Sequence, residues 1–261
     1  MKERVNRVEG KRVEGKLAMV TGGASGLGRE TALLLAREGA RVVVTDINED
    51  AGQAVANEIG EGALFVRHDV ADESSWATVL EATHRHFGSL DILVNNAGIL
   101  IPGSIEDASL EQWRKIMQIN ADSCFLGCKY GVGAMKESGG AIVNVASVSS
   151  WLPINNYPAY SASKAAVAAL TRSTALHCRK SGYRIRVNSV HPDGVYTPMM
   201  QASAPGVDPK YLLFNSDSNR GGRACKPEQV ANVVLFLASD DASYVSGAEI
   251  KVDNAILGMG L

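Results

Sequence analysis

The sequence has little of several features that mark specialised classes of protein. Aromatic residues make up only 6% of its 261 residues, and 26 basic residues against 28 acidic ones leave a formal net charge of −2. A nearly neutral chain has no strong attraction for nucleic acid or an anionic membrane, so we expect neither as a partner. No apolar run approaches the roughly 20 residues of a transmembrane helix. The 46% of hydrophobic and 21% of charged residues are ordinary for a globular protein with a full core.

Cysteine and histidine are scarce as well, and neither is arranged as a metal site. Cys124 and Cys128, two of the four cysteines, stand four residues apart in a stretch expected to be helical. Two small buried thiols explain them better than a redox or metal pair. The five histidines show no metal-ligand spacing, so we expect no bound metal. Reduced cysteines, with an N-terminus that lacks the apolar core of a secretory signal, predict a cytoplasmic protein.

The N-terminal region contains a short internal repeat, in which residues 7–11 and residues 12–16 have the same sequence, RVEGK. This segment is too polar to bury, so we expect residues 1–14 to form a polar tail on the surface. Residues 15–261 are then expected to form one domain, because single α/β domains routinely reach this length.

Short apolar runs that are typical of strands alternate along the chain with amphipathic, helix-like stretches. The apolar runs cover residues 17–21, 41–45, 63–67, 91–95, 141–147, 184–189 and 249–252. This alternation predicts an α/β fold, with one Rossmann-type, doubly wound sheet of about seven parallel strands and helices on both faces. Ligands of such sheets bind beyond the carboxyl ends of the strands.

Glycines cluster where the first apolar run ends. Gly22, Gly26 and Gly28 stand between this run and an amphipathic segment, an order that predicts a strand, a tight turn and a helix start. Their spacing differs from the Gly-x-Gly-x-x-Gly dinucleotide fingerprint, but the physical requirement is the same. Glycine lets the backbone lie against a pyrophosphate, whose charge then meets the free N–H groups of the helix. The turn therefore predicts a dinucleotide site.

Asp46 follows the second apolar run, near the position where an acid holds the adenosine ribose hydroxyls. A 2′-phosphate on that ribose would face the Asp46 carboxylate. Ser25 and Ile47, on either side of the ribose position, offer no cation to offset the repulsion. The sequence therefore favours NAD over NADP.

Tyr160 and Lys164 are four residues apart, so they share one face of an expected helix. A tyrosine has a pKa of about 10, and a nearby cation favours its phenolate form. The pair can therefore serve as a general acid/base, with Lys164 lowering the pKa of Tyr160. The alternative is a solvated lysine beside a packed tyrosine.

Two further polar residues support the first of these interpretations. Ser147 follows the fifth apolar run, where its hydroxyl can hold a substrate oxygen or, alternatively, cap the next turn. No Gly-x-Ser-x-Gly elbow surrounds it, which disfavours a serine nucleophile. Asn120 lies inside an expected helix, where Asn is a poor helix former, so we expect a bend or a water site there.

The long stretch 196–226 mixes proline, glycine and serine with apolar side chains, among them Met199 and Met200. Loops of this length inside a compact domain are usually functional, so we expect a substrate-binding lid. The alternative is a helical insertion packed permanently as core. Trp151 and Leu152 add apolar surface near the expected catalytic tyrosine, which favours a hydrophobic, rigid substrate.

With these motifs in place, the chain resembles the short-chain dehydrogenases/reductases of the classical type from about residue 15 to residue 261. The motifs occur in the order of that family, namely the glycine turn, Asp69-Val70, the run 95–98 (NNAG), Asn120, Ser147 and the Tyr160/Lys164 pair. The resemblance implies that residues 15–261 are an NAD-binding catalytic domain. His191 could lie near the cofactor, although a packing role at a strand end is expected for it.

The resemblance also implies roles for individual residues. The implied cofactor-binding residues are Gly22, Ser25, Gly26, Leu27, Gly28, Asp46, Ile47, Asp69, Val70, Asn96, Ala97, Gly98, Tyr160, Lys164, Pro192, Val195 and Thr197. The implied catalytic residues are Asn120, Ser147, Tyr160 and Lys164, with Asn120 holding a water that links Lys164 to solvent. The implied substrate contacts are Ser147, Trp151, Leu152, Tyr160, Met199 and Met200.

Segments 65–70, 148–153, 191–194 and 256–261 resemble a subgroup of the family, the 3β/17β-hydroxysteroid dehydrogenases of bacteria. Asp193 departs from the wider family, where Pro-Gly is usual, but agrees with this subgroup. The departure leaves open how the backbone beside the nicotinamide carboxamide is shaped.

The resemblance implies an NAD-dependent oxidoreductase that interconverts a secondary alcohol and a ketone on a steroid or a similar hydrophobic molecule. It also implies a homotetramer. Two alternatives stay open, namely the same chemistry on a sugar alcohol or a β-hydroxyacyl thioester, and a non-catalytic NAD-binding sensor.

Overall fold

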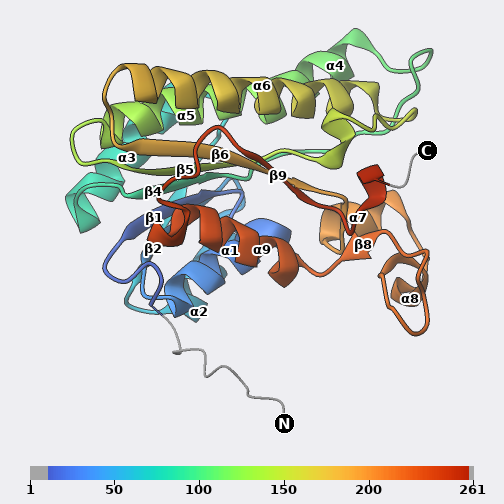
Figure 1. Ribbon diagram of the computed structural model, residues 1–261, viewed down its shortest axis with the longest axis horizontal. Coiled ribbons are helices and arrows are strands. Elements are labelled where there is room, and N and C mark those ends of the chain that lie inside the picture. Colours follow the sequence, from blue (N-terminus) through green and yellow to red (C-terminus); the bar gives the residue numbers. More distant parts are fainter. Residues whose placement is uncertain (1–10, 259–261) are drawn as a thin grey trace.

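The computed structural model describes residues 11–258, which form one central sheet covered by helices on both faces (Figure 1). Its strands are β1 (Leu17–Thr21), β2 (Arg41–Asp46), β3 (Ala63–Arg67), β4 (Ile92–Asn95), β5 (Gly140–Val145), β6 (Ile185–Pro192) and β9 (Glu249–Val252). All neighbours pair in parallel in the order β3-β2-β1-β4-β5-β6-β9. The predicted fold is thereby confirmed.

The helices divide between the two faces of the sheet (Figure 1). One face carries α1 (Gly26–Arg37), α2 (Glu49–Ile59) and α9 (Pro227–Ala238), and the other carries α3 (Glu73–Phe87), α5 (Ser123–Met135) and α6 (Pro158–Lys180). A further helix, α4 (Leu110–Met117), runs through a π-helical turn directly into α5.

Each face of the sheet has its own apolar core. Met19 and Val20 are neighbours in β1 and both are fully buried, yet they belong to different cores because side chains alternate along a strand. Val42, Val43 and Val44 are likewise buried throughout, as expected for a parallel strand covered on both faces. The nearly continuous apolar runs of the sequence therefore have a structural cause.

The strand order reverses between β1 and β4, because β2 and β3 lie on one side of β1 while β4, β5 and β6 continue on the other. In doubly wound sheets this reversal opens a crevice at the carboxyl ends of the strands, where ligands bind. Here the glycine turn follows β1 and the run 95–98 begins at the end of β4. The fold thus brings two separate motifs to one crevice.

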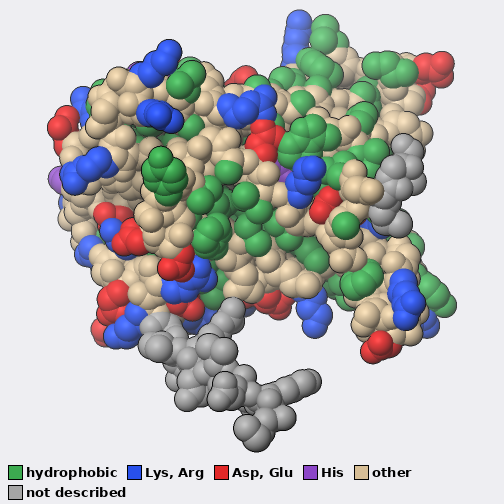
Figure 2. Space-filling model, in the orientation of Figure 1, with side chains coloured by type: hydrophobic (Ala, Val, Ile, Leu, Met, Phe, Trp, Pro, Cys, Tyr) green, Lys and Arg blue, Asp and Glu red, His purple; other side chains and the backbone are tan. Residues whose placement is uncertain are grey.

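The segment after β6 differs from the expected loop. It contains two short helices, α7 (Pro198–Ser203) and α8 (Pro209–Leu212), and two short strands, β7 (Gly194–Val195) and β8 (Ala224–Cys225), which pair in parallel. Neither short helix contributes a buried side chain, so neither is part of a core. Figure 2 shows hydrophobic side chains exposed over the region where α7, α8 and β8 lie in Figure 1.

The predicted N-terminal tail is corrected at its end. Val13, which was expected on the surface, is 1% exposed and belongs to the core under α1 and α9. The backbone N–H groups of Lys11 and Arg12 both donate to the Glu38 carboxylate at 3.1 Å, which fixes this turn against the end of α1. A single valine inside a polar repeat was enough to anchor the turn, while residues 1–10 lie outside the described residues.

Cys124 and Cys128 are buried and not joined in a disulfide, which confirms their interpretation as small core thiols. No helix among residues 11–258 is long and apolar enough to cross a membrane.

Candidate active site

The glycine turn after β1 is packed too tightly for any other residue. Gly22 has φ of +63°, a conformation that side chains rarely adopt, and a Cβ there would lie 2.9 Å from the Ala97 Cα. A Cβ on Gly28 would lie 2.1 Å from the Gly22 carbonyl oxygen. The missing side chains let the start of α1 close onto β1, so the turn requires glycine at both positions.

The start of α1 is open to an anion. Ser25 is the N-cap residue in extended conformation, but its side chain accepts no hydrogen bond from the helix, and no acidic residue stands in the first turn. The first N–H groups of a helix need partners, and an anion such as a pyrophosphate satisfies them. Gly26, with φ of +52°, lies against Thr197, so a residue of the lid closes over the turn. This cradle fits a dinucleotide.

The run 95–98 is bound to the glycine turn by Thr21. The Thr21 hydroxyl accepts the backbone N–H groups of Asn96 and Ala97 at 3.0 and 3.1 Å. In return, the Asn96 amide donates to the carbonyls of Thr21 and Gly22 at 2.9 and 3.2 Å. Sequence reasoning included Thr21 only as the last residue of the first apolar run. A hydroxyl residue placed between a buried strand and a glycine turn was the available signal.

Asp46 stands at the end of β2 with both carboxylate oxygens fixed by backbone. One oxygen accepts from the N–H of Ala24 at 3.1 Å and the other from the N–H of Asn48 at 3.0 Å. The acid is therefore held beside the glycine turn, where the sequence placed it. Its neighbour Ile47 is 63% exposed, so it leaves open surface next to the acid.

Asp69 and Val70 follow β3 and lie at the same edge of the sheet. Asp69 is exposed and its carboxylate accepts the N–H of Ala71 at 3.0 Å. Val70 is buried, and its carbonyl accepts the indole N–H of Trp76 at 3.0 Å. These contacts fix the backbone after β3 and leave the Asp69 side chain exposed.

The structure brings Ser147, Tyr160 and Lys164 together. The Lys164 ammonium lies 5.7 Å from the centre of the Tyr160 ring, is buried, and donates to the Val145 carbonyl at 2.8 Å. The Ser147 hydroxyl is close enough to the Tyr160 hydroxyl to lower its pKa by hydrogen bonding. A buried lysine tied to a strand end excludes the alternative of a solvated lysine beside a packed tyrosine.

Burial acts on both members of the Tyr160–Lys164 pair. Burial raises the pKa of Tyr160 above its ordinary value of 10.0, and the hydrogen bond from the Ser147 hydroxyl opposes that rise. Burial lowers the pKa of Lys164 to about 8. The sequence indicated the neighbours correctly but not the loss of hydration, which disfavours both charged forms.

Asn120 lies in the π-helical turn Gln118–Asp122, which is the irregularity expected there. Its side-chain oxygen accepts the N–H of Ile99 at 2.8 Å, and its amide donates to the Ile99 carbonyl at 3.0 Å and to Ser163 at 3.1 Å. A Cβ on Gly98 would lie 3.3 Å from the Asn120 oxygen and 3.6 Å from the Lys164 nitrogen, so these two side chains meet at Gly98. π-Turns of this kind are frequent at functional sites.

Ser163 is a residue that sequence reasoning did not single out. Its hydroxyl donates to the Tyr160 carbonyl at 2.7 Å and accepts from the Asn120 amide. It therefore joins the helix of the tyrosine to the π-turn. Its position one residue before Lys164 carried no recognisable pattern.

Ser147 caps the turn that follows it, which is one of the two interpretations made of it. Its hydroxyl accepts the N–H of Ser149 at 3.2 Å, which caps the short 3-10 turn Val148–Ser150, and it also donates toward the Pro192 carbonyl at 3.4 Å. The same oxygen is a neighbour of the Tyr160 hydroxyl. Capping fixes the hydroxyl beside that of Tyr160.

His191 is fully buried and holds the backbone of Ser147. Its Nδ1 lies 3.1 Å from the Ser147 carbonyl, which can only accept, so Nδ1 carries the proton and Nε2, 2.8 Å from the Ser189 hydroxyl, accepts. The Trp151 ring stacks on the His191 ring at 4.3 Å. Burial lowers the pKa of His191 to about 4, so the imidazole stays neutral. The expected packing role is confirmed.

The predicted substrate contacts are only partly assembled around Tyr160. The Trp151 ring, 43% exposed, lies between His191 and the Lys251 ammonium, and Leu152 is half-buried beside it. Met199 is 40% exposed on α7, whereas Met200 packs on the backbone, with its terminal methyl 3.1 Å from where a Cβ on Gly194 would stand. The two methionines thus mark one edge of an open, apolar rim.

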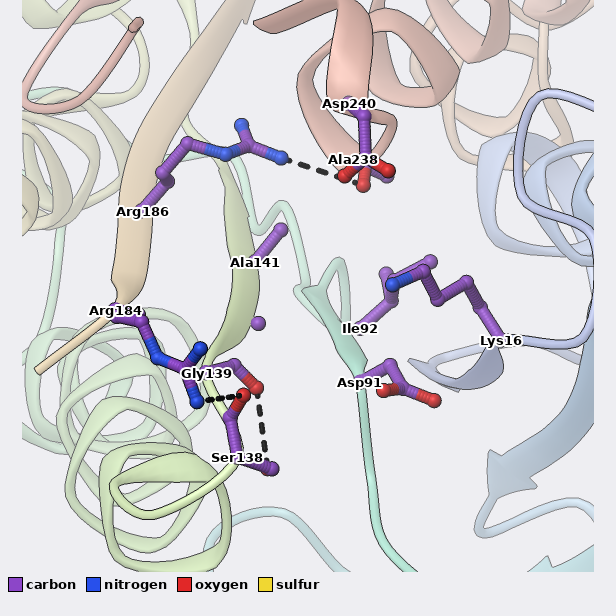
Figure 3. A pocket seen from close by; sticks show the side chains of 11 residues that line it. Lys16, Asp91, Ile92, Ser138, Gly139, Ala141, Arg184, Arg186, Ala238 and Asp240 are labelled. Carbon is purple, nitrogen blue, oxygen red and sulfur yellow. Dashed lines mark hydrogen bonds between the residues drawn. The ribbon is translucent and has the colours of Figure 1, made fainter. Parts of the chain in front are cut away.

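Figure 3 shows a cavity of about 150 Å³ at the opposite, amino edge of the sheet. Arg184 and Arg186 line it and bind backbone carbonyls, among them those of Ser138 and Ala238 at 3.3 and 3.4 Å. The two arginines hold carbonyls after the ends of α5 and α9, and none of the predicted site residues lines the cavity. Within residues 11–258 no group of three or more metal-ligating side chains comes together.

Taken together, the crevice contains a dinucleotide cradle beside the hydroxyl groups of Ser147 and Tyr160 and a buried lysine. Such an arrangement can hold a hydride-accepting cofactor against an alcohol carbon while a tyrosine moves the hydroxyl proton. No serine elbow or metal centre among the described residues points to hydrolysis.

Three comparisons with known proteins agree with this chemistry. A family model described as enoyl-(acyl carrier protein) reductase matches residues 22–255. A 3-beta-hydroxysteroid dehydrogenase of Comamonas testosteroni is 59% identical over 251 residues, which cover 96% of this chain and 99% of the relative. A 3-alpha-(or 20-beta)-hydroxysteroid dehydrogenase of Mycobacterium bovis is 42% identical over 93% of this chain and 89% of its own length.

A solved structure with the same fold is also similar in sequence. It is a short-chain type dehydrogenase/reductase from Mycobacterium marinum, with a TM-score of 0.84 and 34% identity, and the match covers 93% of this chain and 96% of that one.

Proposed function

The chain belongs to the short-chain dehydrogenases/reductases, a family of nicotinamide-dependent oxidoreductases, and we propose that it acts with NAD on the 3β- or 17β-hydroxyl group of steroids. The observation that carries the proposal is the meeting of Ser147, Tyr160 and Lys164 beside the glycine cradle. As the resemblance implies, we further propose a homotetramer, supported by the exposed apolar side chains of Phe125 on α5 and Leu176 on α6.

Each residue of the site has a physical role in this reaction. Tyr160 takes the proton of the substrate hydroxyl as general base, and Ser147 holds the substrate oxygen. When bound, the nicotinamide cofactor supplies the hydride acceptor and, in its oxidised form, a positive charge. Lys164 adds a cation below the ring of Tyr160, and together these charges oppose the rise in the pKa of Tyr160 that burial causes.

The choice of NAD rests on Asp46. Its carboxylate is fixed beside the glycine turn by the N–H groups of Ala24 and Asn48, so it cannot swing away from a 2′-phosphate. Two charges of the same sign at contact distance in partly buried surroundings cost about 4 kcal/mol at most at an effective dielectric constant of 20. NADP is therefore expected to bind much more weakly.

The steroid assignment is supported by the apolar rim and by the relatives. Met199, Met200 and the Trp151–Leu152 pair offer apolar surface to a rigid, hydrophobic substrate. Burial of apolar surface contributes about 25 cal/mol for each Å², before the cost of ordering both partners. A steroid buries far more such surface than a short alcohol, so it should bind more tightly.

The test is a turnover assay with purified protein, NAD+ or NADP+, and matched pairs of alcohols. We expect NAD+ reduction with 3β- or 17β-hydroxysteroids, little with their α-epimers, and a strong preference for NAD+ over NADP+ that Asp46→Ala narrows. Oxidation of a sugar alcohol or a β-hydroxyacyl thioester without any steroid turnover would leave the dehydrogenase and remove the steroid. Binding of NAD without turnover of any alcohol would favour a sensor instead.

A further inference from the structure

An ion pair connects the residue after Pro192 to the far end of the lid. The Asp193 carboxylate receives two hydrogen bonds from the guanidinium of Arg223, from Nε at 2.9 Å and from Nη2 at 2.8 Å. Such two-point contacts are stronger and more directional than a single charge pair. The Asp193 side chain is only 11% exposed, whereas that of Arg223 is 49% exposed. Asp193 is also the position at which the sequence departs from the wider family.

Next to this ion pair, backbone hydrogen bonds join the two ends of the lid to each other. The N–H of Gly194 donates to the Arg223 carbonyl at 3.1 Å, and the N–H of Tyr196 donates to the Cys225 carbonyl at 2.9 Å. We use the term stem for β7, β8 and the Asp193–Arg223 ion pair together. Because α7 and α8 bury no side chain, the stem is the main structure that determines where the lid stands.

The stem is in contact with the chemistry. The Asp193 N–H donates to the Val252 carbonyl at 3.1 Å, and the preceding carbonyl, that of Pro192, accepts from the Ser147 hydroxyl. On the lid side, a Cβ on Gly194 would meet the Arg223 carbonyl at 2.9 Å and the methyl of Met200 at 3.1 Å. Arg223 and Met200 thus both lie against Gly194, two residues after Pro192.

We propose that the Asp193–Arg223 ion pair, which we call the latch, fixes the position of the lid relative to the substrate site. Both residues are then positioning residues. The proposal deepens the proposed function and rests on it only for the nature of the substrate. The charges of the pair act on the stem alone, so the latch changes how the substrate is held and leaves the proton path through Tyr160 in place.

The burial of the two partners predicts an asymmetry between variants. Arg223→Gln leaves the buried Asp193 carboxylate without its cation, which is the costly way to break such a pair. Asp193→Asn replaces the carboxylate by a neutral side chain of the same shape. The arginine that loses its partner is half exposed, so water can hydrate its charge. The double variant removes the unpaired carboxylate again, so it should behave like Asp193→Asn and better than Arg223→Gln.

Limited proteolysis without any substrate tests the latch directly, because Lys210 and Arg220 are exposed trypsin sites inside the lid. We expect cleavage there to become several-fold faster in Arg223→Gln, less so in Asp193→Asn and in the double variant. Glu73→Gln is the matched control, since it breaks an exposed ion pair outside the lid, that of Glu73 with Lys129. Equal cleavage in all five proteins, with circular dichroism showing each one folded, would refute the latch.

Steady-state kinetics then separate positioning from catalysis. We expect Arg223→Gln to raise the KM for a 3β-hydroxysteroid several-fold, with the KM for NAD+ and the kcat changed less than twofold. Arg223→Lys, which keeps the charge but not the two-point contact, should recover part of the loss. A fall in kcat with an unchanged KM would overturn the assignment. If the lid opens in the variants but the wild-type protein turns over no steroid, the proposed function fails and the latch stands.

Discussion

At the scale of single residues, the site depends on side chains whose pKa values are shifted by burial. Tyr160 is the group placed to accept the substrate proton, yet burial raises its pKa, and Lys164 is buried with a pKa of about 8. A catalytic pKa works best near the operating pH. In the free protein Tyr160 is therefore protonated at neutral pH. Further positive charge in the crevice would favour ionisation of its hydroxyl.

Replacement of Tyr160 by Phe tests this role. The ring packing stays, so we expect the fold and cofactor affinity to be retained while kcat falls by several orders of magnitude, because the variant lacks the proposed general base. Circular dichroism, cofactor titration and turnover measure the three properties. Tyr183→Phe, a distant half-buried tyrosine after the end of α6, is the control. If Tyr160→Phe kept more than a tenth of the wild-type activity, the proton would have to leave by another route.

At the scale of elements, the turn between β1 and α1 carries the cofactor cradle, and its geometry is set by backbone contact. Gly28→Ala would place a methyl 2.1 Å from the Gly22 carbonyl oxygen, and no side-chain rotation relieves such a clash. We expect cofactor affinity to fall at least tenfold and the Tm to fall by several degrees. Gly62→Ala is the control, because a Cβ there meets nothing within 4 Å and its φ is not positive. Calorimetric titration with NAD+ gives the affinity, and equal affinities in the two variants would mean that the turn can open freely.

The sequence was sufficient to predict these elements wherever local pattern decides the structure. Continuous apolar runs such as Val42–Val44 predict buried parallel strands, and glycines clustered after the first apolar run predict the turn. What could not be predicted depends on partners far apart in the chain. The β7–β8 pair joins residues 30 positions apart, and the burial of Val13 requires α1 and α9 to be in place. The same reason explains why His191, read as a strand-end residue, gave no sign of its bond to Ser147.

At the scale of the whole molecule, two buried histidines couple stability to pH. His68 and His191 are 1% and 0% exposed, and burial lowers the pKa of each from 6.5 to about 4. Below pH 6.5 the unfolded chain binds protons that the folded protein refuses until the pH is about 4. The free energy of unfolding therefore falls as the pH is lowered through this window, by about 2 kcal/mol for each histidine between pH 7 and pH 5.

Urea unfolding at pH 7 and pH 5 measures this dependence. We expect His68→Gln to lose about 2 kcal/mol of the difference between the two pH values, since it removes one of the two groups. His84→Gln, at an exposed histidine on α3, serves as the control. The same pH dependence in His68→Gln and in wild type would assign the acid sensitivity to other groups.

The position of β9 has a consequence for how the protein is made. This strand is the last of the sheet, it pairs with β6 beside His191 and Pro192, and its Val252 carbonyl accepts the N–H of Asp193. The cradle at residues 22–28 leaves the ribosome long before that partner exists, and domains fold as their chain emerges. The stem of the lid in a nascent chain therefore lacks this contact until residue 252 has been synthesised.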